Sequence, residues 1–298
     1  MKSFSPIIIA LFICSPAFSQ ITVRTAPEPE PPKVSPYDST KNFLGNRGVS
    51  SYIGQLLYVN GKAGILQKHG YDYFYSKKYR GDGCRYGQEY GKAAFNSPYE
   101  SLVGKYFIVK SVEEVGASLN NYWFELENRD KPDDIAWFFY QGEYEHAFPF
   151  IVVSHFEYLK ERYIGKEIVY FKDNPRDEIR IETNKCTDVG IEDRHFNLSL
   201  FFDDGKVVSI EYDKESSPLL GRFILKDAYD RLVTKYGIDM VHKAFNNKIC
   251  VGMPEELLIL SWGKPSDINR NSYNESDQWV YDSQYVYLKN GIVTAWSD

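Results

Sequence analysis

Tyrosine and phenylalanine are unusually frequent in this chain. Its 298 residues include 24 Tyr and 19 Phe, and aromatic residues reach 16%. Flat side chains of this kind pack well on the pleated surface of a sheet, and many of them stand in short apolar or alternating runs bounded by turn residues. This composition excludes collagen, coiled coils and bulk disorder. We therefore expect a fold of the α+β class that is mostly β.

Charge and hydrophobicity are those of an ordinary globular protein. Hydrophobic residues make up 43% of the chain and charged residues 26%, so there is enough apolar material for a core. The net charge is -6 at pH 7. Proteins that bind nucleic acids through electrostatics carry a basic face, so we expect no nucleic-acid partner.

The first 19 residues have the pattern of a secretory signal peptide. A positive charge is followed by an apolar run over 7–13, and Ala17 and Ser19 are the small residues that precede a cut before Gln20. The run is shorter than the ~20 residues needed to span a bilayer, and no later run is long enough. We expect an exported protein, periplasmic or secreted, with no transmembrane segment.

The cysteines give little further information. Cys14 follows Ile13, which does not suit a lipid-attachment site, so we do not expect a lipoprotein. After cleavage Cys84, Cys186 and Cys250 remain, and an odd number allows at most one disulfide. We expect three small buried side chains, with one disulfide or a reactive thiol as the alternative.

A proline-rich segment and a repeated motif organise the chain. Residues 20–46 contain five Pro interleaved with charges, which predicts an extended, disordered linker. In the β-rich region 47–217, three similar segments align at one glycine each: 52–59 at Gly54, 102–109 at Gly104 and 163–170 at Gly165. If they are true repeats, each starts a small antiparallel unit or SH3-like barrel, and its glycine relieves a bend or bulge. The expected units are 47–98, 99–160 and 161–217. The alternative is a chance similarity within a Tyr-rich β-protein.

Strands within these units follow from alternation. They are expected over 71–75, 122–127, 135–140, 179–183, 198–202 and 207–212, with a hairpin turn at 203–205. The glycine-rich, basic segment 77–96 predicts an exposed loop that could hold an anion, although it lacks the form of a P-loop.

Helices are expected only after residue 218, in the final region 218–298. The first covers 225–236 and ends at Gly237, and the second begins at Asp239 and reaches about Phe245. A third starts near Pro254 and stops at Gly263. Strands follow over 278–281, 284–289 and 292–296, and Asn-Gly at 290–291 predicts a tight hairpin between the last two.

This last region resembles the SmpA/OmlA-like domain, which is shared by the assembly lipoprotein BamE and exported Bacteroidetes-type proteins and is seen in β-lactamase inhibitor proteins. The resemblance lies in Val251-Gly252-Met253-Pro254, Trp262-Gly263-Lys264-Pro265, Gln278-Trp279-Val280-Tyr281 and Tyr287-Leu288-Lys289-Asn290-Gly291. It covers about 246–298. It implies a short helical part on a three-stranded antiparallel sheet, and binding to proteins or envelope components rather than catalysis.

Aromatic residues of this region are the candidate interaction residues: Trp262, Trp279, Tyr281, Tyr285, Tyr287 and Trp296. Most of Trp262, Trp279, Tyr281 and Trp296 are expected to form the core of a domain too small to build one otherwise.

No catalytic, metal-binding or cofactor-binding residue is predicted. The motifs HExxH, GxSxG and CxxC are absent, and strand alternation would turn His146 away from Glu143 and Glu145. We therefore expect a non-catalytic exported protein that binds an envelope protein or surface polymer. The alternatives are a carbohydrate or peptidoglycan-fragment binder and a hydrolase with an unrecognised site.

Overall fold

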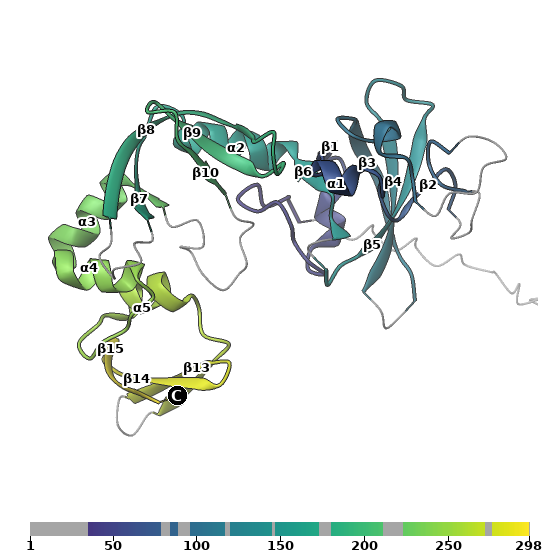
Figure 1. The fold of residues 1–298 in the computed structure, drawn as a ribbon. Coiled ribbons are helices and arrows are strands. Elements are labelled where there is room, and N and C mark those ends of the chain that lie inside the picture. The colour runs from purple at the N-terminus through teal and green to yellow at the C-terminus, as the bar shows by residue number, and fades with distance from the viewer. Residues whose placement is uncertain are drawn as a thin grey trace, which may run out of the picture. The chain divides into compact units, whose positions relative to one another are not determined.

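Three antiparallel sheets and five α-helices form the part of the chain that the computed structural model describes (Figure 1). That part comprises residues 35–78, 84–88, 96–116, 120–144, 147–172, 180–210, 223–271 and 276–297. The α+β, mostly β prediction is confirmed. The predicted signal peptide and most of the predicted proline-rich linker lie outside the described residues. No helix among the described residues is long and apolar enough to cross a membrane.

The first sheet has six strands in the order β2-β5-β4-β3-β1-β6. Its strands are β1 Leu56–Val59, β2 Phe74–Tyr75, β3 Tyr106–Glu114, β4 Asn121–Asn128, β5 Ile135–Gln141 and β6 Phe150–Val152. The strands predicted over 122–127 and 135–140 are confirmed as β4 and β5. The strand predicted over 71–75 shrinks to β2, because Tyr73 has φ 67° and interrupts extended backbone.

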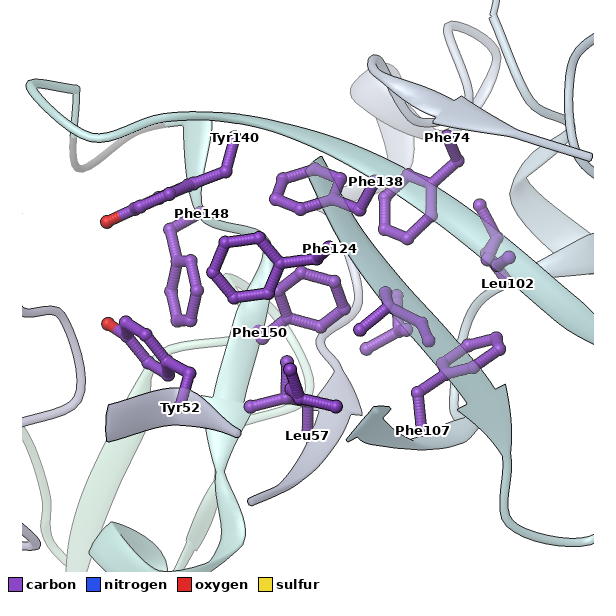
Figure 2. Close-up of a cluster of buried hydrophobic side chains, with 14 of the residues drawn as sticks. Tyr52, Leu57, Phe74, Leu102, Phe107, Phe124, Phe138, Tyr140, Phe148 and Phe150 are labelled. Atoms are coloured by element: carbon purple, nitrogen blue, oxygen red, sulfur yellow. The ribbon is translucent and has the colours of Figure 1, made fainter. Parts of the chain in front are cut away.

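Aromatic rings fill the core of this sheet (Figure 2). Alternate residues of the strands point inwards, so Phe124 from β4 meets Phe138 and Tyr140 from β5. Phe138 and Phe150 pack edge to face, with ring centroids 5.1 Å apart and planes at 89°, a geometry favoured by the ring quadrupoles. Much of the aromatic excess of the sequence is therefore core material.

The segment 37–45 closes one end of this core. The buried Asn42 side chain donates from Nδ2 to Phe150 O at 2.9 Å and accepts from Val152 N at 2.8 Å, so it pairs with the edge strand β6 as another strand would. Tyr140 donates its hydroxyl to Gly45 O at 2.9 Å. Tyr52 accepts a hydrogen bond from Leu44 N at 2.9 Å. These contacts fasten residues 37–45 to the first sheet.

The three glycines of the repeated motif occupy the same kind of turn. Each follows a helical turn and precedes a strand, with φ of 82° at Gly54, 74° at Gly104 and 79° at Gly165. A hydrogen bond closes each turn, as from Gln55 N to Tyr52 O at 2.9 Å. A type II turn requires positive φ at its third residue, which glycine supplies without strain. The glycines thus start the strands instead of bending them.

The first two of these turns are also paired with each other. Gly54 N donates to Val109 O at 2.8 Å, and Gly104 N donates to Val59 O at 3.1 Å. Strand β1 consequently runs antiparallel to β3. This differs from the expectation of one small sheet per unit, because the strands that follow the first two turns pair with each other in the six-stranded sheet.

Two α-helices precede residue 218 in the described part of the chain, which corrects the prediction that helices begin only after it. These are α1 Gly64–Gln67 and α2 Val153–Tyr163. Helix α2 follows β6 directly and buries His155 and Leu159 on one side. No turn separates it from β6 and no side chain caps its start, so the sequence signals that usually mark a helix start are absent.

The second sheet has five strands in the order β10-β9-β8-β7-β11. Its strands are β7 Glu167–Lys172, β8 Arg180–Ile191, β9 Leu198–Phe202, β10 Val207–Ser209 and β11 Phe223–Leu225. The hairpin turn at 203–205 is confirmed, with Gly205 at φ 82°. The glycine-rich loop 77–96 is described only at its ends and at 84–88.

The last region contains three helices and a four-stranded sheet. The helices are α3 Lys226–Tyr236, α4 Ile238–Phe245 and α5 Glu255–Trp262, and the strands are β12 Asp267–Asn271, β13 Ser276–Tyr281, β14 Gln284–Lys289 and β15 Ile292–Ser297. The sequence predicted three strands, and β12 is the fourth. Gly237, not Asp239, stands at the N-cap of α4. The Asn290-Gly291 hairpin is confirmed, with both residues at positive φ.

Candidate functional site

The two faces of the C-terminal sheet separate the candidate interaction residues. The pairing register places Trp279 opposite Val286, and Val286 opposite Trp296, so these side chains share one face. Helices α4 and α5 pack on this covered face through Val241, Phe245, Leu257 and Leu258. Tyr285 and Tyr287 alternate with the buried residues of β14 and therefore point to the opposite face.

Trp262, Trp279 and Tyr281 lie in or against the core, which was expected for most of the four residues Trp262, Trp279, Tyr281 and Trp296. Trp279 is buried among the residues that pack against the helices. Trp262 and Tyr281 stack edge to face, with centroids 5.5 Å apart at 84°. Their polar atoms bind backbone, since Trp262 Nε1 donates to Asn247 O and Tyr281 Oη donates to Gly263 O, each at 3.0 Å. Burial raises the pKa of the Tyr281 hydroxyl, which therefore stays protonated.

The other face of the sheet, called the outer face below, combines aromatic, aliphatic and amide side chains. Tyr285 is 38% exposed, and Tyr287 beside it is half-buried. A row of hydrogen bonds crosses three strands, from Asn269 Nδ2 to Gln278 Oε1 and from Gln278 Nε2 to the Tyr287 hydroxyl, each 3.1 Å long. In the described strands the outer face consists of Asp267, Asn269, Ser276, Gln278, Val280, Tyr285, Tyr287, Lys289, Ile292, Ala295 and Ser297.

Sequence reasoning missed the two amides of this row. Asn269 lies on β12, the strand that was not predicted, and its partnership with Gln278 depends on the pairing of β12 with β13. The alternation of Gln278 with the buried Trp279 was the only local signal that the amide faces outwards.

Trp296 stands apart from the other candidates. It is 43% exposed and lies on the covered face, at the edge strand β15. The start of this edge is occupied, because Gly252 N donates to Val293 O and Val293 N donates to Met253 O, both at 2.8 Å. A bulge interrupts the pairing near Thr294, which makes the edge a poor template for another strand. We therefore do not expect another strand to add to this edge.

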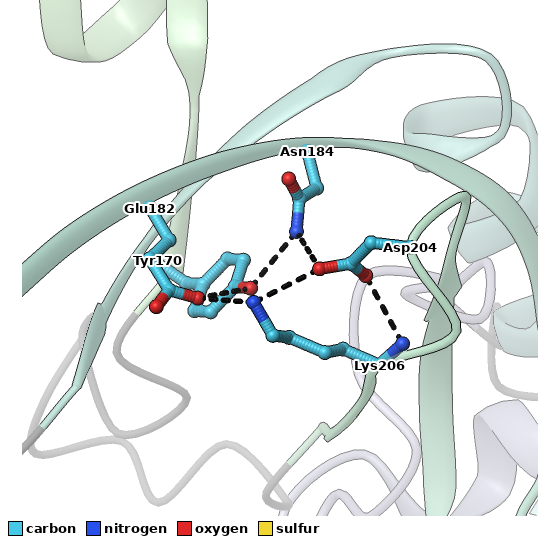
Figure 3. A network of polar contacts seen from close by, with 5 residues as sticks. All are labelled: Tyr170, Glu182, Asn184, Asp204 and Lys206. Atoms are coloured by element: carbon cyan, nitrogen blue, oxygen red, sulfur yellow. Dashed lines mark hydrogen bonds and ion pairs between the residues drawn. The ribbon is translucent and has the colours of Figure 1, made fainter.

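A polar network on the second sheet is satisfied internally (Figure 3). Lys206 Nζ lies 2.5 Å from Glu182 Oε2 and 2.9 Å from Asp204 Oδ2. Asn184 Nδ2 donates to the Tyr170 hydroxyl and to Asp204 Oδ2. Hydrogen bonds to Glu182 and Asp204 raise the pKa of Lys206, and the bond from Lys206 lowers that of Asp204. Each charge has an opposite partner, so the network ties β7 and β8 to the β9–β10 hairpin.

The histidines and cysteines do not gather into a site among the described residues. His155 Nδ1 lies 2.9 Å from Ser39 O, and His242 Nε2 lies 3.0 Å from the Tyr229 hydroxyl. No group of three or more His, Cys, Asp or Glu in the described part of the chain could hold a metal ion. His146 and Glu145 lie outside it.

All three predicted mature cysteines are described and free of disulfides. Cys84 and Cys186 are buried, and Cys250 is half-buried. Cys186 Sγ lies 3.3 Å from Asp188 O, and burial raises the pKa of its thiol. These are properties of packed side chains and not of a reactive thiolate.

Comparison of the chain with family models, curated proteins and solved structures finds no match. The resemblance of 246–298 to SmpA/OmlA-like domains accordingly stays a prediction. The candidate site rests on the geometry of the outer face.

Proposed function

We propose that this chain is an exported, non-catalytic protein that binds an envelope protein through the outer face of its C-terminal sheet. The observation that carries the proposal is the composition of that face, in which Tyr285 and Tyr287 are flanked by amides and small aliphatic side chains. Tyrosine offers a large contact area at low entropic cost, and Asn and Gln adapt their hydrogen bonds, which is why protein-binding surfaces are rich in them.

The charge of the outer face indicates how charged the binding surface of its partner should be. Among the described residues, Lys289 is the one cation and Asp267 the one acid that the pairing register places on this face. A highly charged partner would leave its own charges unpaired in the interface, at a cost in desolvation. The expected partner is therefore a protein surface with few charges. The Gln278–Tyr287 hydrogen bond holds the tyrosine in place before binding and reduces the entropy lost on association.

The identity of the domain supports the same function. We propose that 246–298 is an SmpA/OmlA-like module, because a short helix, a glycine stop and an antiparallel Asn-Gly hairpin follow one another in the order that the resemblance implies. The four strands found here, against three implied, are the departure from that pattern. The signal-peptide pattern of the first 19 residues supports an envelope location.

Carbohydrate binding through exposed aromatic rings is less well supported. Tyr285 and Trp296 are the exposed aromatics of this sheet among the described residues, and they lie on opposite faces. A strip for stacking on sugars needs several rings on one face. A hydrolase stays an alternative that no arrangement of described residues favours.

Site-specific photocrosslinking in the producing cells tests the proposal. A photoreactive amino acid at position 285 or 287 should give one discrete adduct with an envelope protein, and the same probe at Tyr144, which is 48% exposed just after β5, should not. The purified partner should bind the parent and the Tyr144→Ser control equally, and the Tyr285→Ser/Tyr287→Ser variant at least tenfold more weakly, as expected when interface aromatics are removed (about 1.4 kcal/mol per tenfold). Equal adducts at all three positions would contradict the assignment.

A further inference from the structure

The first sheet carries a pocket that is separate from the outer face. It encloses about 440 Å³, within the usual ~300–1,000 Å³ of small-molecule sites. Its polar groups come from segments far apart in the sequence. Tyr86 and Gly87 come from the described part of the glycine-rich segment, Lys105 from the start of β3, and Asp133 and Asp134 from the β4–β5 connection.

Local backbone requirements fix these segments. Gly87 has φ 70°, and a Cβ at this position would lie 2.2 Å from the Cβ of Ser101, so only glycine allows the close approach. Tyr86 N donates to Phe74 O at 3.3 Å, which aligns the segment with β2. Lys105 directly follows the type II turn at Gly104.

A hydrogen-bond network orients the pocket side chains. The Tyr86 hydroxyl donates to Asp134 Oδ2 at 2.5 Å, and Lys105 Nζ donates to the same hydroxyl at 3.1 Å. Burial and the bond to Asp134 raise the pKa of Tyr86. Burial alone would raise the pKa of Asp134 too, but hydrogen bonds from Tyr86 and Asn128 outweigh it and lower the value. At neutral pH Tyr86 is therefore a protonated donor and not a base, which suits binding rather than proton transfer.

Two groups in the pocket keep hydrogen-bonding capacity. The Asp133 carboxylate makes no hydrogen bond or ion pair with the described residues, so both of its oxygens can accept. Lys105 has three N–H donors, and one of them is used by Tyr86, with Asp134 at 3.8 Å. The pocket thus offers free acceptors and free donors together.

We propose that this pocket binds a neutral polyhydroxylated ligand, with its hydroxyl groups donating to Asp133 and accepting from Lys105. A sugar hydroxyl can do both at once. The two carboxylates disfavour an anion, since like charges at short range repel. An ammonium group has donors only and could not accept from Lys105, whereas the hydroxyl groups of a neutral ligand satisfy both Asp133 and Lys105.

Saturation-transfer NMR on the full chain tests this, with glucose and N-acetylglucosamine as neutral probes and glucuronate and protonated glucosamine as charged ones. At least one neutral sugar should bind saturably, more tightly than both charged sugars, and should shift the amide resonance of Gly87. Asp133→Ala and Lys105→Met should each weaken its binding by about tenfold or more, because a hydrogen bond to a charged group is lost. Asp130→Ala and Lys110→Met, which change nearby charges outside the pocket, should bind as the parent does.

Three outcomes would overturn the proposal: no saturable binding of either neutral sugar, a charged sugar binding as tightly as the neutral ones, or unchanged affinity in Asp133→Ala. Asp133 is exposed, so its replacement should leave the fold intact, which circular dichroism checks. This variant also leaves the outer face untouched, so the result is independent of the proposed protein-binding function.

Discussion

Replacing Asn42 should destabilise the first sheet far more than a single side chain at the start of a domain normally would. Its amide is 5% exposed and holds both hydrogen bonds to the edge strand β6, one from Nδ2 to Phe150 O and one from Val152 N to Oδ1. Asn42→Ala leaves a buried carbonyl and a buried N–H without partners. Each orphaned group costs about 1–3 kcal/mol, so we expect a loss of roughly 2–6 kcal/mol in the free energy of unfolding.

Guanidinium unfolding followed by tryptophan fluorescence measures this loss, since Trp123 and Trp137 lie in the same sheet. The midpoint should fall while the slope stays unchanged, which marks a change in stability and not in the unfolded state. Asn96→Ala is the matched control, because its side chain makes one exposed hydrogen bond to His69 O. A loss of about 1 kcal/mol or less is expected there.

Asn42→Asp separates the hydrogen-bond argument from a simple packing effect. The carboxylate can still accept from Val152 N, but when ionised it faces Phe150 O without a proton to donate. The folded state then favours the protonated form, which raises the pKa of the new carboxyl above its unfolded value near 3.9. Stability relative to the parent should therefore recover as the pH falls from 7 to about 4. The proposal that Asn42 pairs with the edge of β6 in place of a neighbouring strand would be wrong on the following result: the free energies of unfolding of both variants match that of the parent within about 0.5 kcal/mol, and Asn42→Asp shows no recovery at low pH.

Three further predictions concern other parts of the chain. Gly70→Ala should lower stability by more than about 1 kcal/mol, because its φ is 59° and the new Cβ would lie 2.0 Å from Ser97 O, whereas Gly64→Ala, with no atom within 4 Å, should be tolerated in the same unfolding assay. Burial lowers the pKa of His242 below 6.5, so the folded state resists its protonation. Stability should fall as the pH drops through 6.5 toward the lowered value, and melting temperatures of His242→Gln should lose that part of the pH dependence. Mass spectrometry of the exported protein should find Gln20 at its N-terminus, and an uncleaved chain in the cytoplasm would end the export proposal.

Much of the local structure was predictable from the sequence because its causes are local. Alternating apolar residues predicted β4, β5, β9, β13, β14 and β15 close to the bounds that the structure shows. The Asn290-Gly291 hairpin needed two residues at positive φ, and the sequence offers the pair best suited to that. Gly237 and Gly263 end α3 and α5 because each adopts a positive φ, which glycine allows without strain.

Other features could not be predicted, because they depend on contacts between distant segments. Helix α2 was missed, since it follows β6 without a turn and no side chain caps its start. The glycine motif was recognised, yet only the pairing of β1 with β3 shows that its first two copies form one sheet. The pocket residues Tyr86, Lys105 and Asp134 stand on separate segments, so their network has no signature in the sequence.

The sequence by itself determined the class of the fold, the turns and most strand positions, since side-chain alternation and glycine conformation act within a few residues. It also singled out six aromatic residues near the C-terminus. Only the tertiary structure decided which of them are core and which face outwards, because a strand's two faces become different when register and helix packing cover one of them. That is why Trp279 is buried, and why Tyr285, six residues later, is left on the outer face.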